Sequence, residues 1–260
     1  MSIPRISVII AARNAEQTLG RALDGLMAQT MKEFEVIVVD DGSTDRTAAI
    51  AREHPCLPTV IINPENRGRG ASRNTAISVA LGRYLAIHDA DDWSMPTRLA
   101  LTLEAAEASG AVVSGGQLRN IARDGSSWTL ATYPLDSESI ANGLKAGRMS
   151  CAHPASLVRR DAFDAVGGYD PTLERAQDLD LFRRLASVGS FINVPEVVAL
   201  YDHHWFLSWK QWRRHIYWHQ RSMGNDVNAF RARSRRNIGR YALSMLRRYF
   251  AFLTTRSREA

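Results

Sequence analysis

Short apolar runs alternate with longer amphipathic segments over the first ninety residues of the chain. Four runs of largely apolar residues are typical of strands buried on both faces, namely residues 6–10, 34–39, 59–62 and 84–87. The segments that separate them carry apolar residues at helical spacing, as Leu19, Leu23 and Leu26 do in the first. This regular alternation predicts an α/β fold, with a mostly parallel sheet flanked by helices on both faces.

The pattern is less regular in the second half of the chain. Apolar spacing predicts helices over residues 95–108, 160–166 and 174–186. Strands are expected over residues 111–114, 127–132, 148–158 and 192–200. In the first half, Ser43 or Thr44 is expected to cap the helix that carries Ile50.

Polar side chains follow three of the first four predicted strands at the point where each strand ends. They are Arg13 and Asn14 after the first, Asp40 and Asp41 after the second, and Asp89, Asp91 and Asp92 after the fourth. The carboxyl ends of parallel strands meet at one edge of a sheet, and ligands bind there. The sequence therefore predicts a nucleotide site at this edge.

The acidic turn after the fourth strand is a candidate metal site. Asp89, Asp91 and Asp92 would repel one another unless a positive charge lay between them. Mg²⁺ and Mn²⁺ take oxygen ligands, usually carboxylates together with phosphate oxygens. We interpret the turn as holding such a cation against a diphosphate. The alternative is a solvated turn in which Asp89 or Asp92 caps the next helix.

The net charge of +6 is unevenly distributed over the 260 residues. Residues 210–260 carry a net charge of +11, so residues 1–209 carry −5. The acidic body argues against nucleic acid, and the basic tail predicts contact with an anionic membrane surface. Trp205, Trp209 and Trp212 lie at helical spacing among arginines. Such a helix either lies in a membrane interface or packs on the body or on a second copy.

Other features concern the compartment and the division of the chain. No run approaches the ~18 apolar residues of a membrane span. Cys56 and Cys151 lie far apart without a metal-ligand spacing, which is typical of a reduced, cytoplasmic protein. The basic tail would bring the protein to the inner face of the cell membrane. We expect one domain over residues 1–204 and a basic, aromatic-rich helical extension over residues 205–260.

Six segments occur in a characteristic order: SVIIAARN, VIVVDDGSTD, NRGRGASRN, HDADDWSMP, VGGYD and QDLDLFRRL. Together they resemble the family 2 glycosyltransferases of GT-A fold, over residues 5–204. The resemblance implies an inverting transferase that uses a nucleotide-sugar, usually a uridine diphosphate sugar, with Mg²⁺ or Mn²⁺ as cofactor. The acceptor would be a hydroxyl of a glycan or glycolipid, in the synthesis of a cell-surface polysaccharide or lipopolysaccharide.

The resemblance also assigns roles to individual residues. Asp178 would be the catalytic base, and Asp40 would accept a hydrogen bond from the nucleotide base. Asp89 and Asp91, which enclose Ala90, would contact the ribose and the metal, with Asp92 and His204 completing the metal site. The donor would also be bound by Ala11, Arg13, Asn14 and Arg73.

Three positions depart from the pattern of this family. Ala11-Ala12-Arg13-Asn14 replaces Pro-Thr-Tyr-Asn, so the guanidinium of Arg13 would stack on the base in place of an aromatic ring. Gln177 replaces a glutamate, and Asp202 replaces an arginine. These changes leave open a degenerate protein of the same fold, which binds nucleotide or a partner without catalysis.

Two questions remain open from the residues alone. Asp178 and Asp180 are two apart and cannot both face a site from one helix, and only the resemblance selects Asp178. His153 either lines the acceptor pocket or is a buried, hydrogen-bonded histidine. Arg67 and Arg69 either pair with a phosphate or lie on the surface.

Overall fold

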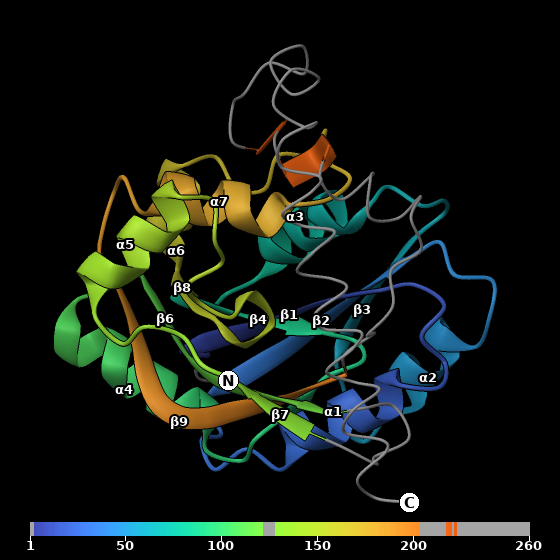
Figure 1. The fold of residues 1–260 in the computed structure, drawn as a ribbon. Coiled ribbons are helices and arrows are strands. Elements are labelled where there is room, and N and C mark those ends of the chain that lie inside the picture. Colours follow the sequence, from blue (N-terminus) through green and yellow to red (C-terminus); the bar gives the residue numbers. More distant parts are fainter. Residues whose placement is uncertain (1–2, 122–127, 203–216, 220, 223–260) are drawn as a thin grey trace, which may run out of the picture.

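The computed structural model describes residues 3–121, 128–202, 217–219, 221 and 222. In this part of the chain a nine-stranded sheet has the order β3-β2-β1-β4-β8-β6-β9-β5, with β7 paired to β6 (Figure 1). The strands are β1 Ile6–Ala12, β2 Phe34–Asp41, β3 Thr59–Asn63, β4 Tyr84–Asp89, β5 Trp93–Ser94, β6 Val113–Ile121, β7 Trp128–Ala131, β8 Leu157–Arg159 and β9 Phe191–Asp202.

The direction of the strands confirms the prediction of a mostly parallel sheet. β1 pairs in parallel with β2 and β4, and β2 with β3. β8 pairs antiparallel with both β4 and β6, so β6 and its parallel partner β9 run in the same direction as the first four strands. The antiparallel exceptions among the described strands are β8 and the two short strands β5 and β7.

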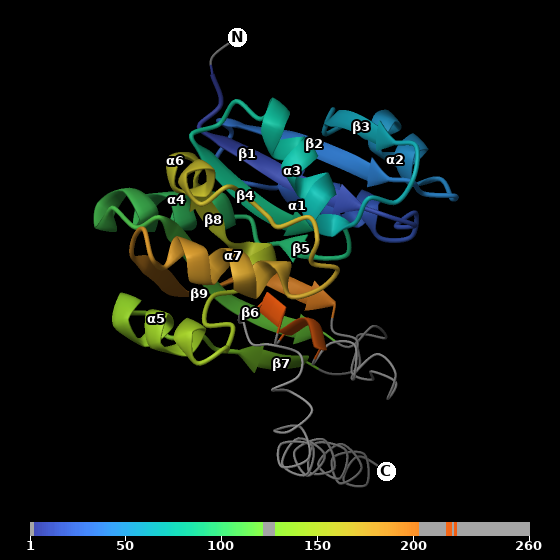
Figure 2. The same cartoon turned by 90° about the horizontal axis from the view of Figure 1, so that it is seen from above.

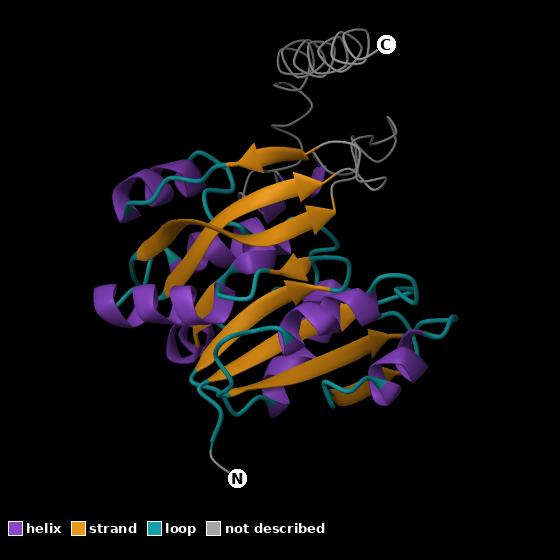
Figure 3. Cartoon of the chain, turned by 90° about the horizontal axis from the view of Figure 1, so that it is seen from below, coloured by secondary structure: helices purple, strands orange, loops and turns teal. Residues whose placement is uncertain are grey.

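Helices cover both faces of the sheet, as Figures 2 and 3 show from above and from below. The helices are α1 Leu19–Met27, α2 Thr47–Glu53, α3 Arg69–Val79, α4 Arg98–Ser109, α5 Ser137–Lys145, α6 Arg160–Ala165 and α7 Gln177–Leu185. One core joins the sheet to α3, α5, α6 and α7. The other core joins the opposite face to α1, α2 and α4.

Alternate residues of the central strands enter different cores. On β1, Ile9 belongs to the core that includes α3 and α7, whereas Val8 and Ile10 belong to the core that includes α1 and α4. On β4, Ile87 belongs to the first of these cores and Ala86 to the second. Burial of both faces explains why these strands read as unbroken apolar runs, and it holds their carboxyl ends in a fixed frame.

The prediction of a strand over residues 148–158 is wrong for most of its length. A short 3₁₀ turn, His153–Ala155, occupies its centre, and β8 begins at Leu157. Pro154 has no backbone N–H to donate to a sheet, so the chain cannot pair there as a central strand.

Two further elements differ from the prediction. β6 runs to Ile121 rather than ending at residue 114, and it passes through Gly115 and Gly116. A Cβ on Gly115 would lie 2.5 Å from Sγ of Cys151, so only glycine permits this close approach. α5 was not predicted, although Asp136 accepts a hydrogen bond from the backbone N–H of Ser139 (2.8 Å) as its N-cap.

The tail lies outside the described residues, except for residues 217–219, 221 and 222. This short piece packs on the body of the protein. Nε2 of His219 donates to the carbonyl of Gly147 (2.7 Å), and Arg183 of α7 donates to the carbonyl of Ser222 (2.9 Å). Membrane contact of the rest stays a prediction. Within the described part of the chain, the helices are too short or too polar to cross a membrane.

Candidate nucleotide and metal site

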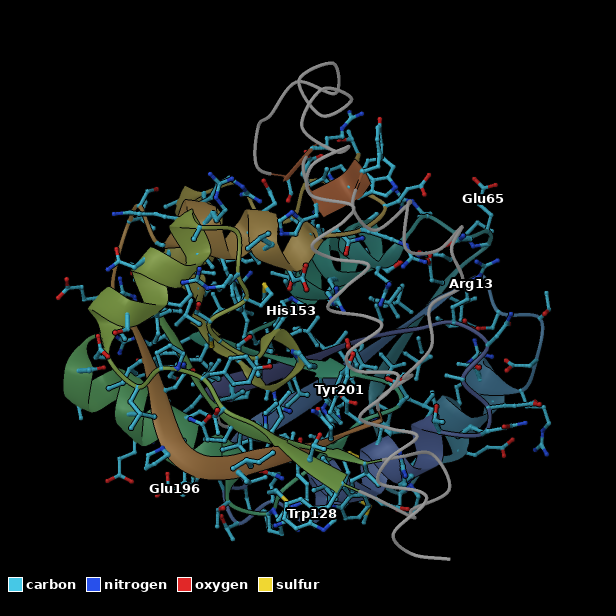
Figure 4. All side chains as sticks on the ribbon, viewed as in Figure 1. Arg13, Glu65, Trp128, His153, Glu196 and Tyr201 are labelled. Carbon is cyan, nitrogen blue, oxygen red and sulfur yellow. The ribbon has the colours of Figure 1, made fainter. Side chains whose placement is uncertain are left out.

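A cavity of about 970 Å³ opens at the carboxyl ends of β1, β2 and β4. Its walls include six residues predicted from the sequence: Ala11, Arg13, Asn14, Asp89, Ala90 and Asp91. Arg67 of the loop before α3 and Arg69, the first residue of α3, also line it, as does Tyr201 near the end of β9. Figure 4 shows where Arg13 and Tyr201 lie relative to these elements. The structure therefore brings together the strand-end residues that the parallel pattern selects.

The acidic turn lies on the wall of this cavity. Carboxylate oxygens of Asp89, Asp91 and Asp92 all lie within 4.8 Å of one another. Asp92 is fully buried, and α4 begins at Arg98 after Thr97, so neither Asp89 nor Asp92 caps the next helix. The capping role that the alternative gave to Asp89 or Asp92 is therefore wrong. A compact set of oxygen donors beside a polar cavity fits Mg²⁺ or Mn²⁺.

Arg73 of α3 fixes the first of these acids. Its Nη2 donates to Oδ1 of Asp89 at 2.7 Å, and its side chain is only 3% exposed. Burial raises the pKa of Asp89, but the charge of Arg73 opposes this and the net pKa lies below its usual range. Asp89 is therefore ionised at neutral pH.

A buried polar network continues from Arg73 into the protein. The guanidinium lies over the ring of Tyr169, 5.6 Å from its centroid, and the Tyr169 hydroxyl bonds Nε2 of His153 at 2.9 Å. Burial and the charge of Arg73 lower the pKa of His153 to about 4, so this histidine is neutral at pH 7. His153 is thus a buried, hydrogen-bonded residue and is not on the wall of the cavity (Figure 4).

Asp178 lies in the first turn of α7 and is partly buried. Its charge contributes to raising the pKa of Arg73, His153 and Tyr169, less than burial changes each of them. Asp180 instead forms an ion pair with Arg184 at 2.5 Å, four residues further along the same helix. Asp178 is not among the residues that line the cavity, so its role as the base stays a prediction.

Two loops at the other end of the cavity hold each other in place. The backbone N–H of Asn14 donates to Oγ of Ser43 (2.9 Å), and Oδ1 of Asn14 accepts from the N–H of Thr44 (3.0 Å). The expected capping of α2 by Ser43 or Thr44 is wrong, because Asp45 accepts from the N–H of Thr47 instead. Asn14 shapes the cavity wall through these bonds.

The neighbouring acids Asp40 and Asp41 face different surroundings. Asp40 is buried and accepts from the N–H of Ser43 (3.0 Å), and it is not on the cavity wall. Asp41 lines the cavity and accepts from the N–H groups of Arg67 (2.8 Å) and Gly68 (2.9 Å). Burial raises the pKa of Asp41, but these bonds outweigh it and lower the pKa overall.

The sequence placed Asp41 at this edge of the sheet but did not reveal its structural role, because its partners lie 26 and 27 residues further along the chain. Arg21 of α1 was also missed, and its Nη2 donates to the backbone carbonyl of Asp91 at 2.8 Å. His204, expected near the metal, lies outside the described residues.

Comparison with known proteins agrees with this geometry. A family model described as glycosyl transferase family 2 matches residues 7–167. The chain belongs to this family. The segments that carry the resemblance in the sequence therefore identify the family correctly, and the cavity lies within the matched region except for its last residues.

Several curated glycosyltransferases are similar in sequence. Chondroitin synthase of Escherichia coli is 30% identical over 200 residues, which are 75% of this chain and 28% of that protein. Succinoglycan biosynthesis protein ExoU of Rhizobium meliloti (strain 1021) is 30% identical over 201 residues, 71% of this chain and 58% of that protein. The chain therefore spans less than two thirds of these relatives.

Solved structures confirm the GT-A fold for this member of the family. A mannosyltransferase from Pyrobaculum calidifontis, in complex with GDP-Man and Mn²⁺, superposes with a TM-score of 0.65 at 22% identity, covering 87% of this chain and 66% of that one. S. aureus TarS residues 1–349, in complex with UDP, gives a TM-score of 0.64 at 20% identity, covering 86% and 66%.

Proposed function

We propose that this glycosyltransferase moves a sugar from a nucleotide diphosphate sugar, with a divalent cation, to a hydroxyl of a glycan or glycolipid, inverting the anomeric centre. One observation carries the proposal. The carboxylates of Asp89, Asp91 and Asp92 converge within 4.8 Å, and Asp89 and Asp91 line a cavity at the carboxyl edge of the sheet, with Asp92 buried behind them. Such an edge is where α/β proteins bind nucleotides.

Asp91 and Asp92, with Asp89, would hold the cation. When bound, Mg²⁺ or Mn²⁺ neutralises the negative charge that develops on the departing diphosphate. Arg73 contributes by keeping Asp89 ionised and in place. Arg67 and Arg69 line the same cavity and add positive charge that attracts the phosphates of the donor.

Asp178 would remove the proton of the acceptor hydroxyl. Inversion requires attack from the face opposite the leaving group, with one base within hydrogen-bonding reach of the attacking oxygen. Asp178 comes from α7, whereas the metal ligands follow β4, so the base and the leaving group approach the sugar from different elements. Because His153 is neutral at pH 7, it adds no positive charge near Asp178.

The names of relatives support a role in polysaccharide synthesis, since they include a chondroitin synthase and two succinoglycan biosynthesis proteins. We propose a uridine diphosphate sugar as the donor. The neighbouring structures contain both a UDP-GlcNAc complex and a GDP-Man complex, so both nucleotides belong in the test.

A donor panel tests the proposed function. UDP-glucose, UDP-galactose, UDP-GlcNAc and GDP-mannose are each incubated with the protein and Mn²⁺, and release of nucleoside diphosphate is measured. We expect release from at least one UDP-sugar, with loss of the signal in EDTA. Nucleotide binding without release from any donor would instead favour the degenerate, non-catalytic alternative.

A further inference from the structure

Arg98, the first residue of α4, is a fully buried arginine directly beneath the acidic turn. Its side chain is 1% exposed. Nη2 donates to the backbone carbonyl of Ile87, and Nη1 donates to Oγ of Ser94 (2.8 Å) and to Nδ1 of His88 (3.0 Å). Because an arginine only donates, Nδ1 of His88 must be the acceptor in this pair.

The partners of Arg98 lie on both sides of the acidic turn. Ile87 and His88 come immediately before Asp89, and Ser94 comes two residues after Asp92. One rigid guanidinium therefore connects the strand that enters the turn to the short strand β5 that leaves it. This planar group thus ties the two arms of the turn together, in addition to the pairing of β5 with β9.

Burying the charge of Arg98 costs free energy, so packing alone does not explain why an arginine occupies this position. Moving an ion into the interior costs several kcal/mol, and an apolar side chain of similar volume would pack without that cost. Burial lowers the pKa of Arg98 to about 10, while the charges of Asp92 and Asp89 oppose the shift. The guanidinium is thus still charged at neutral pH, and the nearby charges of Asp92 and Asp89 favour this charged form.

We propose that Arg98 is a positioning residue for the metal site. It holds the two arms of the acidic turn at the spacing that brings the oxygens of Asp89, Asp91 and Asp92 together, and it places a fixed positive charge beneath them. The bracing of the turn stands on the contacts of Arg98 alone. The effect on metal binding rests on the proposed function.

Two effects of removing Arg98 oppose each other. Loss of a nearby positive charge would strengthen the attraction between the carboxylates and a dication. Loss of the brace would let the three acids separate, and a cation bound through several ligands at once depends on their spacing. Because outer groups that orient ligands typically change metal affinity by about 10- to 100-fold, we expect the loss of the brace to dominate.

The test uses the full chain and two readouts. Hydrogen exchange of the backbone amides of residues 88–95, without ligand, measures the bracing. Titration of Mn²⁺ in the presence of UDP, followed by electron paramagnetic resonance, measures the metal site. In Arg98→Met we expect faster exchange in this segment and an Mn²⁺ dissociation constant raised about 10- to 100-fold. In Arg98→Lys, the exchange rate and the Mn²⁺ dissociation constant should lie between those of Arg98→Met and the parent. The reason is that lysine donates hydrogen bonds but lacks the planar fork of arginine.

A matched control is available at the other end of β4. Arg160 also donates to backbone carbonyls, those of Ala80 and Ile77, but it lies near the amino end of the strand. Arg160→Met should lower the melting temperature while leaving the exchange of residues 88–95 and the Mn²⁺ affinity unchanged. Should Arg98→Met not fold, Ser94→Ala removes one of its partners and is expected to show the same two changes at smaller amplitude.

The outcomes separate the two proposals. Unchanged exchange and unchanged or tighter Mn²⁺ binding in Arg98→Met would overturn the role of Arg98, as would equal effects of the Arg98 and Arg160 variants. A parent protein that binds no Mn²⁺ would contradict the proposed metal site, whereas the exchange measurement would still decide whether Arg98 braces the turn.

Discussion

Asp178→Asn should bind donor and cation as the parent does and lose turnover by a factor on the order of 10³, because general base catalysis contributes about 10²- to 10⁴-fold. The substitution keeps the size and hydrogen-bonding capacity of the side chain at the start of α7 and removes only its basicity. The measurement is the rate of nucleoside diphosphate release at saturating donor, together with the dissociation constant of the nucleoside diphosphate.

Asp180→Asn is the matched control for this prediction. Asp180 lies on the same helix two residues away, but its carboxylate is paired with Arg184. Its loss removes a partly buried ion pair, so stability should fall slightly while turnover stays within about twofold of the parent. Full activity in Asp178→Asn, or equal losses in the two variants, would remove Asp178 as the base.

Asp91→Ala should abolish metal-dependent binding of nucleotide, the second large effect expected. Asp91 contributes a carboxylate to the cluster and lines the cavity. We expect UDP affinity in Mn²⁺ to fall to the level measured in EDTA, with the melting temperature without ligand nearly unchanged. Isothermal titration of UDP with and without Mn²⁺ measures the affinities, and thermal unfolding without ligand measures the melting temperature.

The choice of Asp91 over Asp89 follows from the structure. Asp89→Ala would leave the guanidinium of Arg73 buried without its carboxylate, and the resulting destabilisation would be mixed with the loss of metal. Asp24→Ala is a suitable control, because this exposed acid of α1 pairs with His54 and is not on the cavity wall. Retained metal-dependent binding in Asp91→Ala would contradict the assignment of the acidic turn.

Local patterns in the sequence were sufficient for the sheet and for one wall of the site. Ile9 and Ile87 belong to apolar runs whose carboxyl ends are in register, so the polar residues that follow them had to meet at one edge. The acids after β4 needed no knowledge of distant contacts to be selected. Their position directly after a predicted strand, together with the pattern of a parallel sheet, was enough to select them as site residues.

What the sequence did not reveal depends on contacts between distant residues. Arg98 reads as an ordinary charged residue at the start of a helix, and only the structure shows that it is buried and bonded to β4 and β5. Nothing in the sequence distinguishes the role of Asp41 from that of Asp40. The structure separates them, because the backbone N–H groups of Arg67 and Gly68 donate to Asp41. Pro154 was the local signal that should have prevented the prediction of a strand over residues 148–158.

The central claim is that the acidic turn at the end of β4 binds a divalent cation together with a diphosphate. Crystals soaked with Mn²⁺ and UDP, with anomalous scattering to locate manganese, test it directly. We predict manganese between the carboxylate of Asp91 and the diphosphate oxygens, with the uridine in the cavity lined by Arg13 and Asn14. Manganese absent from the turn while UDP is bound, or UDP bound elsewhere, would contradict the account.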